Sequence, residues 1–360
     1  MQSGKVRMIR GPAVVTVRGA CYVLGSSVSG QKITIRSGKV LPFEATRRCR
    51  LVTQLGRGGK TWVTDPRFAG TSIWYDVVHR VLSLLENKRV VVMLVGATDT
   101  GKSTFSTYLA NLALESGFVP AIIDGDIGQG DLGPPTSIGA VILSKQTIDL
   151  RDIICSLFEF VGSTSPVGFE HIVVGKLKLL LEKVESFADI CIVNTDGYVS
   201  SGGAQYKLMI AKENQPDVIV CLGKEDELLK MLGAWNVIHA RPSRVLKSRY
   251  ARRTGRLSQF LRHVGSGYFV AELSKIKFAY KDRLFSESEL SYPPIRQLER
   301  ENLKRMFVGL GSENRIDGFG IVTNLTESEI FVQTDVDSFA LIYLSNIRFA
   351  KDKVAEINVS

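Results

Sequence analysis

Residues 96–103 have the types and spacing of a phosphate-binding loop. They read G-A-T-D-T-G-K-S and fit the pattern G-x-x-x-x-G-K-[ST]. In such a loop the backbone N–H groups and the positive end of the following helix face the phosphates of a nucleotide. Lys102 would reach the β- and γ-phosphates, and the Ser103 hydroxyl would ligate Mg²⁺. The predicted nucleotide contacts are Gly96, Ala97, Thr98, Asp99, Thr100, Gly101, Lys102, Ser103 and Thr104.

Asp99 is an unusual member of this loop because it is an acid inside an anion-binding site. Its charge opposes phosphate binding unless the side chain faces away or approaches an acceptor hydroxyl. A structural hydrogen-bonding role is the favoured interpretation.

Two further carboxylates, Asp124 and Asp126, end the next predicted strand in the run D-G-D-I-G-Q. A carboxylate at this place can hold Mg²⁺, directly or through water, and can accept the proton of an attacking hydroxyl. The alternative is that the pair caps a turn. Asp126 is the first candidate for the chemistry and Asp124 the second.

A hydroxyl, a carboxylate and an aromatic ring follow another predicted strand in the run Thr195-Asp196-Gly197-Tyr198. Stacking of a nucleobase on the Tyr198 ring would contribute about 1–3 kcal/mol. A partly buried tyrosine in a tight turn is the alternative, and residue type alone does not separate the two.

Four arginines, Arg249, Arg252, Arg253 and Arg256, stand at helical spacings i, i+3, i+4 and i+7. That spacing puts them largely on one face of a helix. Folded over a nucleotide, such a face would neutralise charge on a phosphoryl group in transfer, an effect of about 10³–10⁵ in rate.

These residues require an alternating strand and helix framework to position them. Short apolar strands are expected at 90–95, 119–124, 189–194, 217–222 and 236–240, and helices at 72–86, 104–114, 152–161, 170–187 and 225–235. The alternation predicts an α/β fold with a parallel sheet covered by helices, as in P-loop NTPases. Ligands in such sheets bind at the carboxyl ends of the strands, where all the motifs above fall.

Small all-β domains are predicted on both sides of this framework. Short strands are expected at 11–19, 32–36, 40–43 and 50–53, and again at 267–271, 276–280, 318–322, 329–333 and 340–344. The predicted domains are residues 1–68, residues 69–264 with an arginine-rich lid at 241–262, and residues 265–360.

Charge is spread unevenly along the 360 residues, whose net charge is +10. Residues 1–68 hold thirteen basic and two acidic residues, and residues 241–262 hold eight basic and no acidic ones. Two basic islands on an acidic body indicate a polyanionic partner such as a nucleic acid. The alternative for either island is a solvated basic surface without a partner.

Cysteine usage and hydropathy indicate a cytoplasmic protein with no membrane partner. The five cysteines are scattered without metal-ligand spacing, which fits a reducing compartment. The first twelve residues lack the apolar run of a signal peptide, and no apolar run is long enough to span a bilayer.

The motifs resemble those of the P-loop polynucleotide 5′-hydroxyl-kinase family, the RNA kinases of pre-mRNA 3′-end, tRNA and rRNA processing and their archaeal relatives. The resemblance rests on G-A-T-D-T-G-K-S-T, I-I-D-G-D-I-G-Q-G-D-L-G-P-P, N-T-D-G-Y-V and S-R-Y-A-R-R-T-G-R. It is sharp over residues 89–262 and architectural outside them. The family's three-part layout, with a kinase domain between two β-rich domains, is similar to the predicted one.

The resemblance implies a role for each motif. Residues 195–198 resemble the clasp that holds the terminal nucleotide, and residues 249–256 resemble the mobile lid, for which Arg252 and Arg253 offer two alignments. Asp126 resembles the acid at the metal and the 5′-hydroxyl. Taken together, the residues and the resemblance predict Lys102, Asp126, Asp124, Arg252 and Arg256 as catalytic residues. The predicted metal ligands are Ser103 and Asp126, and the predicted substrate contacts are Gln129, Thr195, Asp196, Gly197, Tyr198, Arg249 and Arg253.

The resulting hypothesis is an ATP- and Mg²⁺-dependent kinase that phosphorylates the 5′-hydroxyl end of RNA, with DNA left open as an acceptor. Catalysis would come from positioning and electrostatics. Two alternatives stay open: a P-loop ATPase switch, and a non-catalytic RNA-processing subunit that only holds ATP. Some members of the family act more as scaffolds than as kinases.

Overall fold

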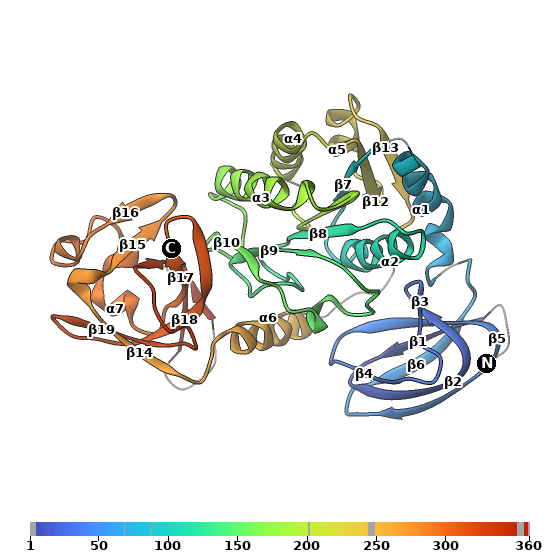
Figure 1. Cartoon of the computed structure of the whole chain (residues 1–360), viewed down its shortest axis with the longest axis horizontal. Coiled ribbons are helices and arrows are strands. Elements are labelled where there is room, and N and C mark those ends of the chain that lie inside the picture. Colours follow the sequence, from blue (N-terminus) through green and yellow to red (C-terminus); the bar gives the residue numbers. More distant parts are fainter. Residues whose placement is uncertain are drawn as a thin grey trace. The chain divides into compact units, whose positions relative to one another are not determined.

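The computed structural model describes residues 5–67, 69–86, 88–200, 202–243, 249–350 and 356–358. Two compact units are present, residues 1–123, 141–153 and 181–255 in the first, and residues 124–140, 154–180 and 256–360 in the second. Figure 1 shows the elements of both in chain order. The predicted domain limits at 68 and 264 stay a prediction, and Phe68 itself lies outside the described residues.

An antiparallel sheet forms the N-terminal part of the first unit. Its strands are β1 (Val6–Arg10), β2 (Ala13–Val23), β3 (Ser26–Ser27), β4 (Lys32–Ile35), β5 (Val40–Leu55) and β6 (Lys60–Thr64), in the order β3-β2-β5-β1-β6 with β4 on β2. The two strands expected at 40–43 and 50–53 are one strand, β5. It stays extended through its polar middle because β2 pairs with it from Leu55 to Glu44, across a bulge between Gly19 and Cys21.

A seven-stranded sheet carries the predicted chemistry. Its strands are β7 (Val90–Val95), β8 (Pro120–Gly125), β9 (Ser137–Ile142), β10 (Leu157–Phe160), β11 (Ile190–Thr195), β12 (Val218–Leu222) and β13 (Val237–Ala240), in the order β10-β9-β8-β11-β7-β12-β13. β7 pairs in parallel with β11 and β12, as predicted. These strands are almost wholly buried, which explains their continuous apolar sequences.

The predicted helix at 152–161 is wrong. A short 3₁₀ turn at Leu150–Asp152 and the strand β10 occupy this stretch, and β10 pairs antiparallel with β9. The sequence L-F-E-F of β10 fits a strand with aromatic side chains better than a helix, and pairing with β9 satisfies its backbone groups. The sheet is therefore mixed at this edge rather than parallel throughout.

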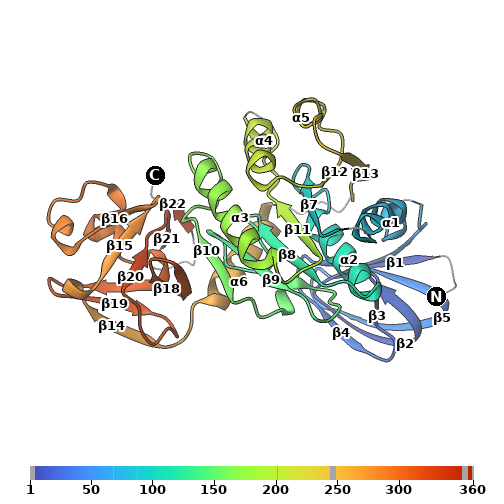
Figure 2. The same ribbon diagram turned by 45° about the horizontal axis from the view of Figure 1, so that its top comes forward.

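Helices pack on both sides of the strands of the first unit. The α-helices in the described part of the chain are α1 (Tyr75–Leu82), α2 (Lys102–Glu115), α3 (Glu170–Glu185), α4 (Gly203–Asn214), α5 (Asp226–Met231), α6 (Arg249–His263) and α7 (Arg300–Leu303). Short 3₁₀ helices at Ser72–Trp74 and Ser83–Glu86 extend α1. Figures 1 and 2 show α1 and α2 on one side of β7 and β12, and α4 and α5 on the other.

A second β-rich body belongs to the second unit. Its strands are β14 (Tyr268–Glu272), β15 (Lys277–Tyr280), β16 (Arg283–Phe285), β17 (Phe307–Ser312), β18 (Arg315–Leu325), β19 (Glu329–Gln333) and β20 (Leu341–Tyr343), in the order β14-β19-β18-β17-β20-β15-β16, and β21 (Ile347–Phe349) pairs with β22 (Glu356–Asn358). One hydrophobic core lies within this β-rich body. In a second hydrophobic core, Phe260 of α6 packs with Phe160, Phe307 and Phe319. The prediction of β-rich parts on both sides of the α/β sheet is confirmed.

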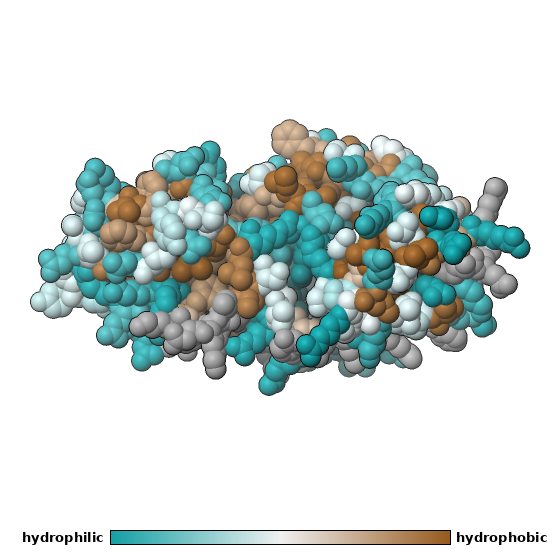
Figure 3. Space-filling model, turned by 90° about the horizontal axis from the view of Figure 1, so that it is seen from below, coloured by the Kyte–Doolittle hydropathy of each residue, from teal (hydrophilic) through white to brown (hydrophobic). Residues whose placement is uncertain are grey.

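Hydrophilic and hydrophobic side chains are interspersed on the surface in Figure 3. None of the helices in the described ranges is long and apolar enough to cross a membrane.

Candidate active site

The phosphate loop joins the buried end of β7 to the N-terminus of α2. Gly96 and Gly101 adopt positive φ angles of 144° and 98°, and Gly101 is the N-cap of α2. A Cβ at Gly96 would lie 2.5 Å from the Leu222 carbonyl oxygen, so this position has no room for a side chain. The first turn of α2 therefore presents its backbone N–H groups at the loop, as an anion site requires.

Lys102 lies inside the loop with 7% of its surface exposed. Its Nζ donates hydrogen bonds to the carbonyl oxygens of Gly96 at 2.7 Å and Ala97 at 2.8 Å. The loop backbone thus holds the ammonium at its centre, where it can exchange these bonds for phosphate oxygens.

Asn194 contacts the loop hydroxyl and was not predicted as a site residue. It lies in β11, and its Nδ2 donates to Ser103 Oγ at 3.2 Å. The bond fixes the Ser103 oxygen as an acceptor. The only signal in the sequence is the position of Asn194 directly before the T-D-G-Y run.

The turn after β11 packs directly on the phosphate loop. A Cβ at Gly197 would overlap the Thr98 hydroxyl and lie 2.6 Å from the Thr98 backbone nitrogen. The Thr195 hydroxyl is buried and donates to the Leu94 carbonyl of β7 at 2.8 Å. The structure therefore brings the predicted turn and the loop together, and it uses the Thr195 side chain to join β11 and β7.

Asp196 holds this turn in place through an ion pair and two hydrogen bonds. It is 5% exposed, its Oδ1 pairs with Lys207 Nζ at 2.9 Å, and its Oδ2 accepts a hydrogen bond from the Tyr206 hydroxyl at 3.0 Å. Oδ1 also accepts the Tyr198 backbone N–H at 2.8 Å. Tyr198 is half-buried, and a Cβ at Gly203 would lie 2.6 Å from its carbonyl group. Through its hydrogen bond with the Tyr198 backbone, Asp196 fixes the position of Tyr198.

The arginine helix α6 contacts the loop through Arg252. Arg252 Nη1 pairs with Asp99 Oδ2 at 2.8 Å. Arg249 and Arg253 are exposed, and Arg256 is half-buried. Between the two lid alignments, the structure thus places Arg252 at the phosphate loop. Arg244 and Lys247 of the predicted basic segment lie outside the described residues.

The two candidate carboxylates belong to the second unit and differ in burial. Asp124 is 2% exposed, and its Oδ2 accepts the backbone N–H of Asp131 at 2.6 Å. Asp126 is half-buried, and its Oδ1 accepts the N–H groups of Gly128 at 3.1 Å and Gln129 at 2.9 Å. Both carboxylates therefore shape the turn, while Asp126 is the more accessible of the two.

Helix α6 also supports this turn within the second unit. Gln259 is buried, and its Nε2 donates to the carbonyl oxygens of Gly130 at 3.3 Å and Asp131 at 3.4 Å. Gln129 itself is half-buried. Gln259 thus connects helix α6 by hydrogen bonds to the loop that follows the D-G-D-I-G-Q run.

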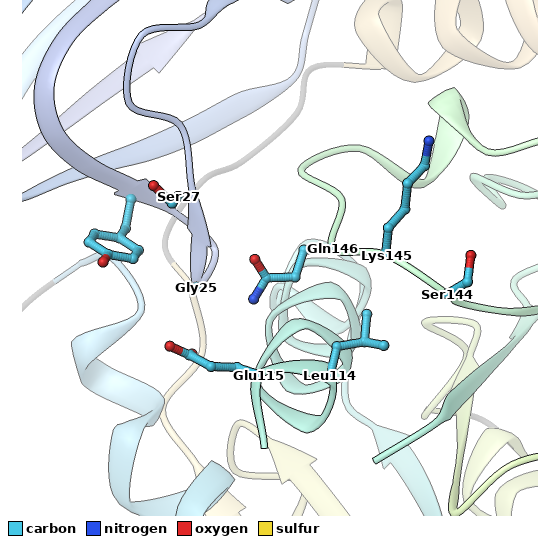
Figure 4. Close-up of a pocket in the computed structure, with 8 residues that line it drawn as sticks. Gly25, Ser27, Leu114, Glu115, Ser144, Lys145 and Gln146 are labelled. Carbon is cyan, nitrogen blue, oxygen red and sulfur yellow. The ribbon is translucent and has the colours of Figure 1, made fainter. Parts of the chain in front are cut away.

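A separate cavity of about 400 Å³ lies at the opposite end of α2. It is lined by Tyr22, Gly25, Ser27, Leu114, Glu115, Ser144, Lys145 and Gln146, as Figure 4 shows. Because α2 rises about 1.5 Å per residue, the helix separates this cavity from the phosphate loop. It is not the predicted nucleotide site.

Fold and loop together define a P-loop NTPase-type protein. The family model described as "mRNA cleavage and polyadenylation factor CLP1 P-loop" matches residues 96–263. A polyribonucleotide 5′-hydroxyl-kinase of Pyrococcus abyssi is 32% identical over 277 residues, which cover 75% of this chain and 77% of that protein. The chain belongs to the P-loop polynucleotide 5′-hydroxyl-kinase family, as the resemblance predicted.

Two further comparisons show how much of the chain is similar to known proteins. A polyribonucleotide 5′-hydroxyl-kinase of Methanocaldococcus jannaschii is 39% identical over 145 residues, so the match spans only 40% of that relative's length and 40% of this chain. The solved structure of a wild-type Clp1p–Pcf11p complex superposes with a TM-score of 0.76 at 14% identity and covers 97% of this chain and 96% of that one. This last match confirms the fold class, an α/β P-loop sheet with flanking β-rich parts.

Proposed function

We propose that the protein is an ATP-dependent polynucleotide 5′-hydroxyl-kinase that transfers the γ-phosphate to the 5′ end of RNA. The observation that carries the proposal is the convergence of two elements on one phosphate loop. Gly197 of the Tyr198 turn packs on Thr98, and Arg252 of the arginine helix pairs with Asp99. A loop that only hydrolyses a nucleotide has no need of an aromatic turn and an arginine helix at the same place.

The residues of the loop would bind the triphosphate and stabilise charge on it. Lys102 would exchange its two backbone partners for the β- and γ-phosphate oxygens, and Arg252 would neutralise charge on the γ-phosphoryl group. Tyr198 would stack the terminal base. Asp126 would accept the proton of the 5′-hydroxyl while the new O–P bond forms, and ADP would leave as the bond to the β-phosphate breaks. Asp124 would hold the turn that carries Asp126.

The side-chain oxygens of Ser103 and Asp126 fit Mg²⁺, which would supply positive charge next to the phosphates when bound. Mg²⁺ prefers oxygen ligands and takes one or two from the protein with the rest from phosphates and water. Ser103 and Asp126 would supply these two. Over the described ranges there is no cluster of three His, Cys, Asp or Glu side chains suited to a metal, so a bound ion would rely on the nucleotide.

The N-terminal sheet supports a nucleic acid as the second substrate. Arg18 pairs across the strands with Arg50, and Arg10 with Lys60. Like charges directly opposite one another destabilise a sheet unless an anion neutralises them. None of these four cations forms an ion pair with any residue in the described ranges. A phosphate backbone lying over the sheet would satisfy both pairs.

The names of relatives support the same acceptor, since the Pyrococcus abyssi and Methanocaldococcus jannaschii proteins are polyribonucleotide 5′-hydroxyl-kinases. None of the five cysteines, all of which lie in the described ranges, forms a disulfide bond, which supports a cytoplasmic location.

A transfer assay with γ-labelled ATP tests the proposal. The kinase should label a 5′-hydroxyl RNA and leave a 5′-phosphate RNA of the same sequence unlabelled, and a DNA version compares the two acceptors. Release of labelled phosphate without labelled RNA would support the ATPase switch instead. Binding of ATP and RNA with neither product would support a non-catalytic subunit.

A further inference from the structure

Two neighbouring residues of the phosphate loop hold the arginine segment at two points. The Thr100 carbonyl oxygen accepts the backbone N–H of Ser243 at 2.7 Å, and Asp99 Oδ2 pairs with Arg252 at 2.8 Å. Trp74 adds a third bond, from its Nε1 to the Arg241 carbonyl at 2.7 Å. The ion pair of Arg252 with Asp99 therefore couples the arginine helix to the loop itself.

Asp99 is part of the backbone turn of the loop, and its side chain is mostly buried. It has a positive φ of 64°, and its side chain is 8% exposed. Among residues with a side chain, Asn and Asp are those that most readily adopt this left-handed conformation. An Asn would satisfy the backbone equally well without a charge, so the conformation does not explain the carboxylate.

The charge of the loop depends on Arg252. Residues 96–103 contain one cation, Lys102, and one anion, Asp99, so their side chains sum to zero. A negative charge at such short range opposes a triphosphate, and burial strengthens the effect. When Arg252 pairs with Asp99, the loop and its partner carry a net positive charge.

We infer that Asp99 makes triphosphate binding conditional on Arg252, so that the loop accepts a nucleotide only with the arginine helix in place. Asp99 is thus a positioning residue: it holds Arg252 at the loop and penalises binding when that arginine is absent. The inference rests on the proposed function in one respect, that a nucleoside triphosphate is the ligand of the loop.

A double-mutant cycle on the full chain tests this coupling. Calorimetry would measure the Kd of a non-hydrolysable ATP analogue with Mg²⁺ for the wild type, Arg252→Ala, Asp99→Asn and the double variant. Arg252→Ala should raise the Kd at least about tenfold. Asp99→Asn should change it by less than about threefold, and the double variant should recover most of the affinity that Arg252→Ala loses.

Controls separate charge from folding. Arg80→Ala removes an exposed arginine from α1, outside the predicted lid, and should leave the Kd unchanged. Arg252→Lys keeps the charge and should restore most of the affinity. Unchanged melting temperatures would show that each variant folds.

Two outcomes would overturn the inference. A double variant as weak as Arg252→Ala would mean that Arg252 does not act through Asp99. A wild type with no affinity for the analogue would overturn both the inference and the nucleotide site of the proposed function. If the cycle shows the coupling but no phosphate reaches RNA, only the proposed reaction fails.

Discussion

Lys207 and Asp196 form an ion pair of 2.9 Å, with Lys207 fully buried beneath the turn that carries Tyr198. A buried carboxylate that loses its cation is costly, because no water replaces the partner. The pair links α4 to the carboxyl end of β11. Through the Tyr198 N–H bond on Asp196, it also sets the position of the ring proposed to stack on RNA.

Lys207→Met should lower the free energy of unfolding by about 3 kcal/mol. The variant keeps the length of the side chain but leaves Asp196 without its cation, and urea denaturation measures the loss. Lys212→Met, on the exposed side of the same helix, is the control and should cost less than about 0.5 kcal/mol. Equal effects of the two substitutions would show that the pair does not hold the turn.

Gly197→Ala should weaken ATP binding by about tenfold and lower the free energy of unfolding by about 1–3 kcal/mol. The new Cβ would lie 2.6 Å from the Thr98 nitrogen, so the phosphate loop would have to move. Gly175→Ala in α3 is the control: a Cβ there meets nothing within 4 Å, and the helix should gain up to about 1 kcal/mol. Wild-type ATP affinity in Gly197→Ala would contradict the close packing of turn and loop.

Arg18→Ala with Arg50→Ala should weaken RNA binding and reduce its salt dependence. Each lost phosphate contact should lower the slope of log K against log salt by about 0.7 for a single strand. Relief of the repulsion between the two arginines should leave the protein at least as stable as before. Fluorescence anisotropy at several salt concentrations measures the slope, with Arg80→Ala on α1 as the control. A slope that stays at the wild-type value would place the RNA elsewhere.

The thiols of the central sheet should be unreactive in the folded protein. Burial raises the pKa of Cys191 to about 12 and that of Cys221 to about 11, from an ordinary value of 9.0. At pH 8 the folded thiols should react with a disulfide reagent at least about 100-fold more slowly than free thiols. Stability should fall as the pH rises above about 9, because the unfolded thiols lose protons there while the folded ones keep them. Rapid labelling of Cys191 or Cys221 in the native protein would contradict the burial.

The sequence predicted the parts of the fold that depend on local pattern. β7, α2 and β11 were found because short apolar strands and a glycine loop carry their signal within a few residues. The prediction of a helix at β10 was wrong because the structure of this stretch depends on pairing with β9. No local sequence pattern indicates that pairing.

The sequence alone could predict the motifs of the site but not the contacts between their residues. The sequence predicts the loop and the T-D-G-Y turn as site motifs, yet the hydrogen bond from Asn194 to Ser103 joins residues 91 positions apart. The ion pair of Arg252 with Asp99 likewise required the fold, since Arg252 and Arg253 lie in the same helical turn. The structure pairs Asp99 with Arg252, a partner that residue type alone did not indicate.

Single-turnover transfer of labelled γ-phosphate to a 5′-hydroxyl RNA tests the central claim most directly. The wild type should place the label on the 5′ end of the RNA. Asp126→Asn should slow this transfer at least about 100-fold, and Lys102→Ala should abolish it. Hydrolysis of ATP by the wild type with no label on the RNA, or transfer by Asp126→Asn at the wild-type rate, would contradict the account.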